Sequence, residues 1–195
     1  AIFLAIGAYK SRKLSIPGEN AIGCIDCLSF LRDVRLCQNT NIGKKVAIVG
    51  GGNAAIDAAR TAYRLECDEV SIVYRRTRSE MPANVEEIDE LIKEGVKIYE
   101  CVAPVKVVEE DGKVAGLECI KTKLGAVDST GRPKPIPIEG SNFTLSVDTI
   151  IVAISQEPEI ESIAKELQLD VNPNQTLVVD QSTLASKSPG IFAGG

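Results

Sequence analysis

Apolar runs alternate with amphipathic stretches through the middle of the chain. Val46–Val49 is a short apolar run of the kind that forms a buried central strand. Two further strands are expected over Val70–Tyr74 and Val96–Cys101. Between the three strands, Asn53–Arg64 and Asn84–Glu94 carry apolar residues on one face and predict helices. Because strands and helices alternate, the pattern predicts an α/β fold with a parallel sheet and right-handed crossovers.

The pattern changes after the third strand. Val105–Glu109 and Val114–Lys121 flank a turn and predict a β-hairpin. Leu124–Asn142 is rich in Gly, Pro, Ser and Thr, which indicates an extended excursion on the surface. Phe143–Val147 then closes an antiparallel β-meander.

The remaining segments flank this central part. Asn20–Leu36 has apolar residues at three-residue spacing and predicts one helix. Asp148–Ser155 returns as a core strand and closely resembles the predicted strand Ala1–Ala8. A short helix is expected over Ile160–Leu167 and a strand over Leu177–Asp180.

A glycine turn joins the first strand of the α/β pattern to its helix without a gap. Gly50, Gly52 and Ala55 fill the G-x-G-x-x-G/A pattern of Rossmann-like dinucleotide sites. The turn needs Gly50, a pyrophosphate can approach Gly52, and the small Ala55 lets the helix lie close to the strand. The helix N-terminus directs free N–H groups at the phosphates. The predicted cofactor-binding residues of the turn are Gly50, Gly51, Gly52, Asn53, Ala54 and Ala55.

Arginines follow the second strand, at the position that distinguishes NAD from NADP. An NAD site usually offers an acidic residue there, whereas this chain has Arg75, Arg76 and Arg78. A guanidinium forms paired, charge-assisted hydrogen bonds with phosphate, so these residues favour NADPH, with Arg78 the weaker candidate. The alternative is a solvated basic turn.

These motifs resemble one known family along nearly the whole chain. The match is to the NADPH-binding domain of the glutamate synthase small (beta) subunit family of FAD-dependent pyridine nucleotide oxidoreductases. That family is related to the flavoprotein part of dihydropyrimidine dehydrogenase and to NADPH-dependent ferredoxin oxidoreductases. The segments that carry the resemblance are Gly50–Arg60, Val73–Arg76, Glu80–Ala83, Phe3–Ala8, Ile16–Glu19, Asp148–Ile154 and Pro189–Gly195.

The resemblance implies a redox function. NADPH bound here would deliver a hydride to FAD, and electrons would continue to [4Fe-4S] centres outside this chain. The expected partners are the rest of the FAD domain and either a glutamate synthase large subunit or a ferredoxin. Because the cofactors carry the chemistry, no catalytic side chain is assigned. The alternatives are a stand-alone dinucleotide-binding module without catalysis and an NADPH:ferredoxin-type oxidoreductase subunit.

The resemblance also implies a domain organisation. Residues 1–16 would be the edge of an FAD domain, residues 17–155 an inserted Rossmann-like NAD(P)-binding domain, and residues 156–195 a truncated return to the FAD domain. The sequence is then a fragment. Ser155 and Gln156, at the end of the returning strand, would lie near the nicotinamide, although a plain strand-end turn explains them equally well.

Cys24 and Cys27 form a C-x-x-C pair. Such a pair can be a redox dithiol or half of a metal site, but no second pair supplies further ligands, and redox pairs normally open a helix. Because this pair falls inside the predicted helix Asn20–Leu36, two packed cysteines are the favoured interpretation, and no metal site is predicted.

The composition argues against several classes of partner and of chemistry. The formal net charge is −5, which argues against nucleic acid and an anionic membrane, and no apolar run is long enough to span a bilayer. The six cysteines show no disulfide framework, which suits a reducing cytoplasm. The sequence has no histidine, so histidine-based acid–base chemistry is excluded.

Overall fold

The computed structural model describes residues 1–128 and 131–194, which form two compact units. The larger unit is Lys13–Ile154, and the smaller combines Ala1–Arg12 with Ser155–Gly195. The assignment of the smaller unit to an FAD domain stays a prediction.

A five-stranded parallel sheet forms the centre of the larger unit. Within it, Ile48 is paired with Ile151 on one side and with Ile72 on the other, and all three side chains are fully buried. The predicted parallel sheet is therefore confirmed. In spatial order the strands are β3 (Cys24–Asp26), β11 (Thr149–Val152), β4 (Lys45–Val49), β5 (Glu69–Tyr74) and β6 (Lys97–Glu100).

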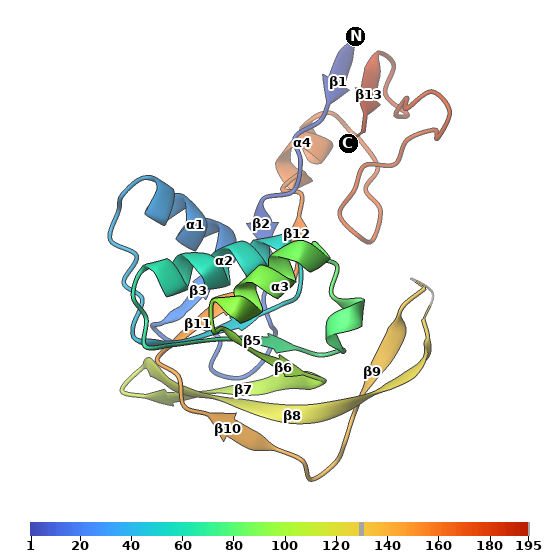
Figure 1. Ribbon diagram of the computed structural model, residues 1–195. Helices are drawn as coiled ribbons and strands as arrows, with labels where there is room; N and C mark the ends of the chain where they lie inside the picture. Colours follow the sequence, from blue (N-terminus) through green and yellow to red (C-terminus); the bar gives the residue numbers. More distant parts are fainter. Residues whose placement is uncertain (129–130, 195) are drawn as a thin grey trace. The chain divides into compact units, whose positions relative to one another are not determined.

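Helices cover one face of this sheet (Figure 1). They are α1 (Cys27–Arg35), α2 (Asn53–Arg64) and α3 (Val85–Lys93). Side chains alternate along a strand, so Val46 and Ile48 of β4 pack in the cluster on the helix side, whereas Ala47 and Val49 pack in the cluster on the other side. The buried stripe of α2 consists mainly of small residues, Ala55, Ala58, Ala59 and Ala62 with Ile56, which allows the helix to lie close to the sheet.

An antiparallel sheet covers the opposite face (Figure 1). Its strands are β7 (Val102–Glu110), β8 (Lys113–Val127), β9 (Pro133–Pro137) and β10 (Phe143–Leu145), with β8 paired to the other three. The predicted hairpin and closing strand are confirmed. The predicted surface excursion over Leu124–Asn142 instead includes the end of β8 and all of β9, and Ser129 and Thr130 within it lie outside the described residues.

The predicted helix over Asn20–Leu36 is wrong in its first part. Cys24–Asp26 is the edge strand β3, paired in parallel with β11, and the helix begins only at Cys27. Asp26 caps this helix, because its Oδ1 accepts a hydrogen bond from Ser29 N at 2.6 Å. Backbone hydrogen bonding to the edge of β11 therefore outweighs the helical spacing of the apolar residues in this segment.

The smaller unit contains short elements. Strand β1 (Ile2–Leu4) pairs in parallel with β13 (Ile191–Ala193), β2 (Lys10–Ser11) pairs antiparallel with β12 (Gln156–Glu157), and α4 is Glu161–Glu166.

One expectation for the flanking segments needs correction. The predicted strand Leu177–Asp180 is wrong, because within the described residues Leu177 makes only an isolated bridge with Val171. The two similar segments contribute to different sheets: Ala1–Ala8 contributes β1 to the smaller unit, and Asp148–Ser155 contributes β11 to the large sheet.

Candidate functional site

The first two glycines of the turn after β4 are required by packing. Gly50 has φ +150°, and a Cβ added to it would lie 2.2 Å from the carbonyl oxygen of Ala153. A Cβ on Gly51 would lie 2.6 Å from the ring of Tyr74. The end of β4 is thus confined between β11 and the Tyr74 ring.

The third glycine has no such packing reason. Gly52 has φ −90° and ψ 176°, which any residue can adopt, and the nearest atom to an added Cβ is Pro82 Cγ at 3.9 Å. Gly52 is also the N-cap of α2, where no side chain caps the helix and the first turn has no acidic residue. An open position beside uncapped N–H groups fits the close approach of a phosphate.

The rest of the predicted turn holds the beginning of α2 in place. Ala55 is fully buried against the core, as a close helix–strand contact requires. The Asn53 side chain accepts a hydrogen bond from Asn84 N at 3.0 Å, and the Ala54 carbonyl accepts one from the Cys27 thiol at 3.2 Å. The starts of α1 and α3 are therefore bonded to the start of α2.

The three predicted arginines lie in different environments. Arg75 is exposed, and its carbonyl accepts a hydrogen bond from Thr122 Oγ1 at 2.9 Å. Arg76 is only 4% exposed, and its Nε donates to the Pro133 carbonyl at 2.6 Å. Its Nη2 lies 3.6 Å from Asp128 Oδ2, so Arg76 joins β5 to the β8–β9 hairpin.

Arg78 begins a short 3₁₀ turn, η1 (Arg78–Glu80), after β5. Its guanidinium is half exposed and lies 3.7 Å from Asp89, while its backbone N–H donates to Glu100. Arg75 and Arg78 are thus both exposed, but of the three arginines Arg75 alone takes part in none of the ion pairs of residues 1–128 and 131–194. All three assignments remain predictions.

Three residues near this edge of the sheet were not identified from the sequence. Tyr74 packs its ring against Gly51 and donates from its hydroxyl to the Glu80 carbonyl at 2.8 Å. Arg132 reaches the same hydroxyl from the β8–β9 hairpin. Asp26, at the carboxyl end of β3, holds the buried oxygen Oδ2, which has no hydrogen-bond partner among the described residues.

Ser155 and Gln156 belong to the smaller unit. The Ser155 carbonyl accepts a hydrogen bond from Arg12 N at 3.1 Å, and Gln156 pairs with Ser11 in the ladder of β2 and β12. Both residues are thus held by the segment that enters the larger unit. Their predicted position near a nicotinamide stays a prediction.

The cysteine pair does lie at the start of a helix, contrary to expectation. Cys24 is in β3 and Cys27 is the first residue of α1, an arrangement typical of redox pairs. Burial, however, raises the pKa of Cys24 to about 11 and that of Cys27 to about 12. Both thiols therefore stay protonated at neutral pH, which favours packing over redox chemistry.

Replacing both Cys24 and Cys27 with serine is expected to leave the affinity for NADPH within about twofold of the wild-type value, because neither thiolate is available for chemistry. Calorimetric titration measures the affinity, and the exposed Cys37→Ser serves as the control. Loss of binding by the double variant with an unchanged melting curve would contradict this interpretation.

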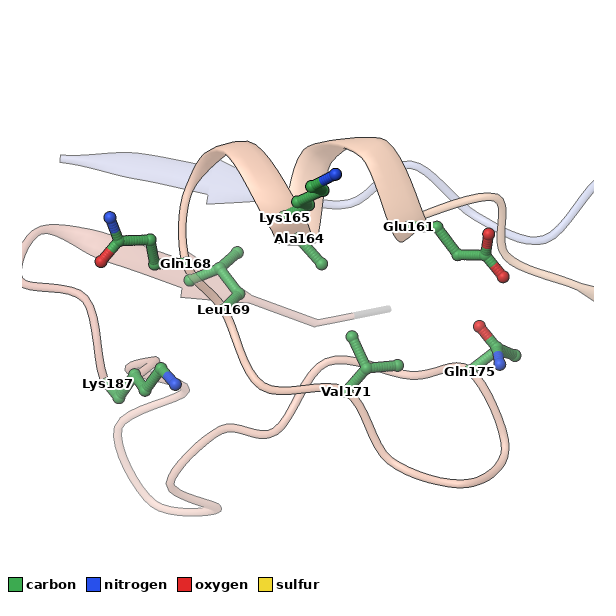
Figure 2. Close-up of a pocket in the computed structure, with 8 residues that line it drawn as sticks. All are labelled: Glu161, Ala164, Lys165, Gln168, Leu169, Val171, Gln175 and Lys187. Carbon is green, nitrogen blue, oxygen red and sulfur yellow. The ribbon is translucent and has the colours of Figure 1, made fainter.

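A hollow of about 430 Å³ lies within the smaller unit (Figure 2). None of its lining residues belongs to the predicted cofactor site, and they come from α4 and the loops that follow it: Glu161, Ala164, Lys165, Gln168, Leu169, Val171, Gln175 and Lys187. Among the described residues, no cluster of three or more His, Cys, Asp or Glu side chains could hold a metal ion. None of the helices in residues 1–128 and 131–194 has the length and apolar character to span a membrane.

A parallel sheet with a glycine turn, a closely packed helix and arginines after the next strand defines a Rossmann-like dinucleotide-binding domain. The family model described as pyridine nucleotide-disulphide oxidoreductase matches residues 1–195. The chain therefore belongs to the pyridine nucleotide-disulphide oxidoreductase family. Members of this family bind FAD and NADPH, which confirms the predicted cofactors at the level of the family.

Individual relatives agree with this membership. The chain is 39% identical over 198 residues to the NADP(+)-dependent formate dehydrogenase subunit beta of Moorella thermoacetica, a match covering 100% of this chain and 28% of that protein. It is 35% identical over 208 residues to the glutamate synthase [NADPH] small chain of Azospirillum brasilense, a match covering 100% of this chain and 43% of that protein. The resemblance to glutamate synthase small subunits is confirmed, and the chain spans less than half the length of either relative.

A solved structure has the same fold. FprA of Mycobacterium tuberculosis, in complex with NADPH, aligns with a TM-score of 0.77 at 17% identity over 100% of this chain and 57% of that chain. The predicted fold class is confirmed.

Proposed function

We propose that this chain is the NADPH-binding part of a flavoprotein oxidoreductase related to the glutamate synthase small subunit. The observation that carries the proposal is Gly52, a glycine that the fold does not require, at the uncapped start of α2. The exposed Arg75 follows the neighbouring strand, where a 2′-phosphate is recognised in NADP sites. Pyrophosphate and 2′-phosphate thus each have a matching group.

The chain contributes binding and orientation to the reaction. The N–H groups at the start of α2 hold the pyrophosphate, and Arg75, supported by Arg76, holds the adenosine end. When bound, NADPH supplies a hydride and FAD accepts it. Orienting one cofactor against the other is the main catalytic effect, so no side chain needs to act as an acid or a base.

The activity of the whole protein is part of the proposal. Hydride would pass from NADPH to FAD, and electrons to iron–sulfur centres of a partner subunit. A glutamate synthase large subunit or a ferredoxin suits this role, since relatives are named as subunits of glutamate synthase and formate dehydrogenase. Ser155 and Gln156 would lie near the nicotinamide, and the cytoplasm would be the compartment.

Titration with NADPH and NADH tests this proposal. We expect tighter binding of NADPH, and loss of that preference in Arg75→Ala/Arg76→Ala, because each charge-assisted hydrogen bond to phosphate contributes about 1.5–3 kcal/mol. Arg75→Ala alone should account for most of the loss, since Arg76 is engaged with Pro133 and Asp128. Arg35→Ala, at an exposed arginine of α1, is the matched control.

Equal affinity of the wild-type protein for the two nucleotides would show that the arginines form only a solvated turn. Preserved NADPH preference in the double variant would contradict their assignment. If NADPH binds and the complete protein lacks flavin, the chain is a binding module and the redox proposal is wrong.

A further inference from the structure

The β8–β9 hairpin is attached to the carboxyl end of β5 by arginine side chains. Nη2 of Arg132 donates to the Tyr74 hydroxyl at 2.7 Å and also to the Glu80 carbonyl. Arg76 forms the reciprocal contact from β5, donating to the Pro133 carbonyl. A segment more than fifty residues away in sequence thus brings a second basic side chain to the end of β5.

The side-chain partners of Arg132 are neutral. Arg76 and Arg78 form ion pairs with Asp128 and Asp89, whereas the ion pairs within residues 1–128 and 131–194 do not include Arg132 or Arg75. The Asp128 carboxylate accepts a hydrogen bond from the backbone N–H of Arg132. The half-buried Arg132 guanidinium is held by a hydroxyl and a carbonyl and has no carboxylate partner among the described residues, so it can bind an anion.

Tyr74 links this charge to the glycine turn. A Cβ added to Gly51 would collide with the Tyr74 ring, and the Tyr74 hydroxyl accepts a hydrogen bond from Arg132. Arg75 follows Tyr74 directly in the chain and is exposed. Two arginines that take part in none of the ion pairs of residues 1–128 and 131–194 thus belong to this end of β5: Arg75, which follows the strand directly, and Arg132, whose side chain reaches it from the hairpin.

We propose that Arg132 binds the 2′-phosphate of NADPH together with Arg75 and so helps to select NADPH over NADH. This inference rests on the proposed function, because it requires a dinucleotide at the glycine turn. It gives the β8–β9 hairpin a part in cofactor recognition.

Arg132→Gln is the decisive variant. Glutamine retains an N–H donor for Tyr74 and Glu80 but removes the positive charge. We expect binding of NADPH and of 2′,5′-ADP to weaken by about tenfold or more, while binding of NADH and 5′-AMP stays unchanged. Lys134→Gln removes an exposed charge from the same hairpin and is the matched control, for which no change is expected.

The possible outcomes are distinct. The first outcome applies if the wild-type protein prefers NADPH. If the Arg132→Gln variant then keeps that preference, or loses affinity for all four nucleotides by the same factor, Arg132 only holds the hairpin in place and the inference is wrong. If the wild-type protein does not distinguish NADPH from NADH, the proposed cofactor itself is wrong.

A measurement on the wild-type protein removes any dependence on folding of the variant. Phenylglyoxal modifies accessible arginines, and peptide mass spectrometry locates the modified residues. We expect 2′,5′-ADP, but not 5′-AMP, to protect Arg132. Equal modification of Arg132 with and without 2′,5′-ADP would overturn the inference.

Discussion

Gly52→Val is expected to abolish measurable NADPH binding while leaving the fold intact. The backbone at Gly52 suits any residue, and the nearest atom to an added Cβ is 3.9 Å away, so the valine fits the protein itself. Its side chain occupies the space through which a pyrophosphate approaches the N–H groups of α2. We expect affinity to fall by about a hundredfold or more, equivalent to about 3 kcal/mol, with a melting temperature within a few degrees of the wild-type value.

Calorimetric titration and thermal unfolding on the same preparation check both parts. Gly52→Ala provides a graded comparison, since one methyl group should weaken binding less than the two further carbons of valine. Unchanged affinity in Gly52→Val would show that no phosphate approaches this position. Loss of binding together with loss of fold would contradict the claim that Gly52 is not needed for packing.

Gly50→Ala is expected to destabilise the larger unit by about 3 kcal/mol or more, the largest effect on folding that we anticipate from a single methyl group. The backbone at Gly50 has φ +150°, and the added Cβ would lie 2.2 Å from a carbonyl oxygen of the backbone. That carbonyl belongs to Ala153, whose N–H is bonded to Val49 at the end of β4, so it cannot move without breaking the strand pair.

Urea unfolding of wild type and variant measures the difference. Gly112→Ala is the control, because Gly112 also has positive φ, +74°, but an added Cβ meets nothing within 4 Å. The free energy of unfolding of the Gly112→Ala control should fall by only about 1 kcal/mol, which is the conformational cost of placing alanine at a positive φ. Equal losses in the two variants would mean that the contact with Ala153 is relieved by small shifts.

The central unit was predictable because its signals are local and agree with one another. The apolar run of β4, the glycines after it and the small residues of α2 adjoin in sequence, and each indicates the same strand–turn–helix. The same holds for β5, α3 and β6. Where a glycine is the only possible residue, as at Gly50, the pattern and the packing have the same cause.

The errors arose where partners distant in sequence decide the structure. Cys24–Asp26 has helical spacing, yet it becomes a strand because β11, formed by residues 149–152, offers it a ladder. Leu177–Asp180 has a strand composition but, in the part of the chain that the structure describes, it has no partner strand beyond one bridge. Arg132 stands in a polar stretch with no motif, and only the pairing of β8 with β9 brings it to Tyr74.

The position of β11 has a consequence for how the protein is made. This strand lies between β3 and β4 in the sheet, yet it is the last of the five to leave the ribosome. A hydrogen bond from Lys45 N–H, at the start of β4, to Asp148, the residue before β11, spans 103 residues, so closing the sheet requires a long loop to form. Until then, the nascent chain carries β4 with an unpaired edge, which is a template for association with other chains. The emergence of Thr149–Val152 from the ribosome is therefore the step after which the domain can protect its own edge.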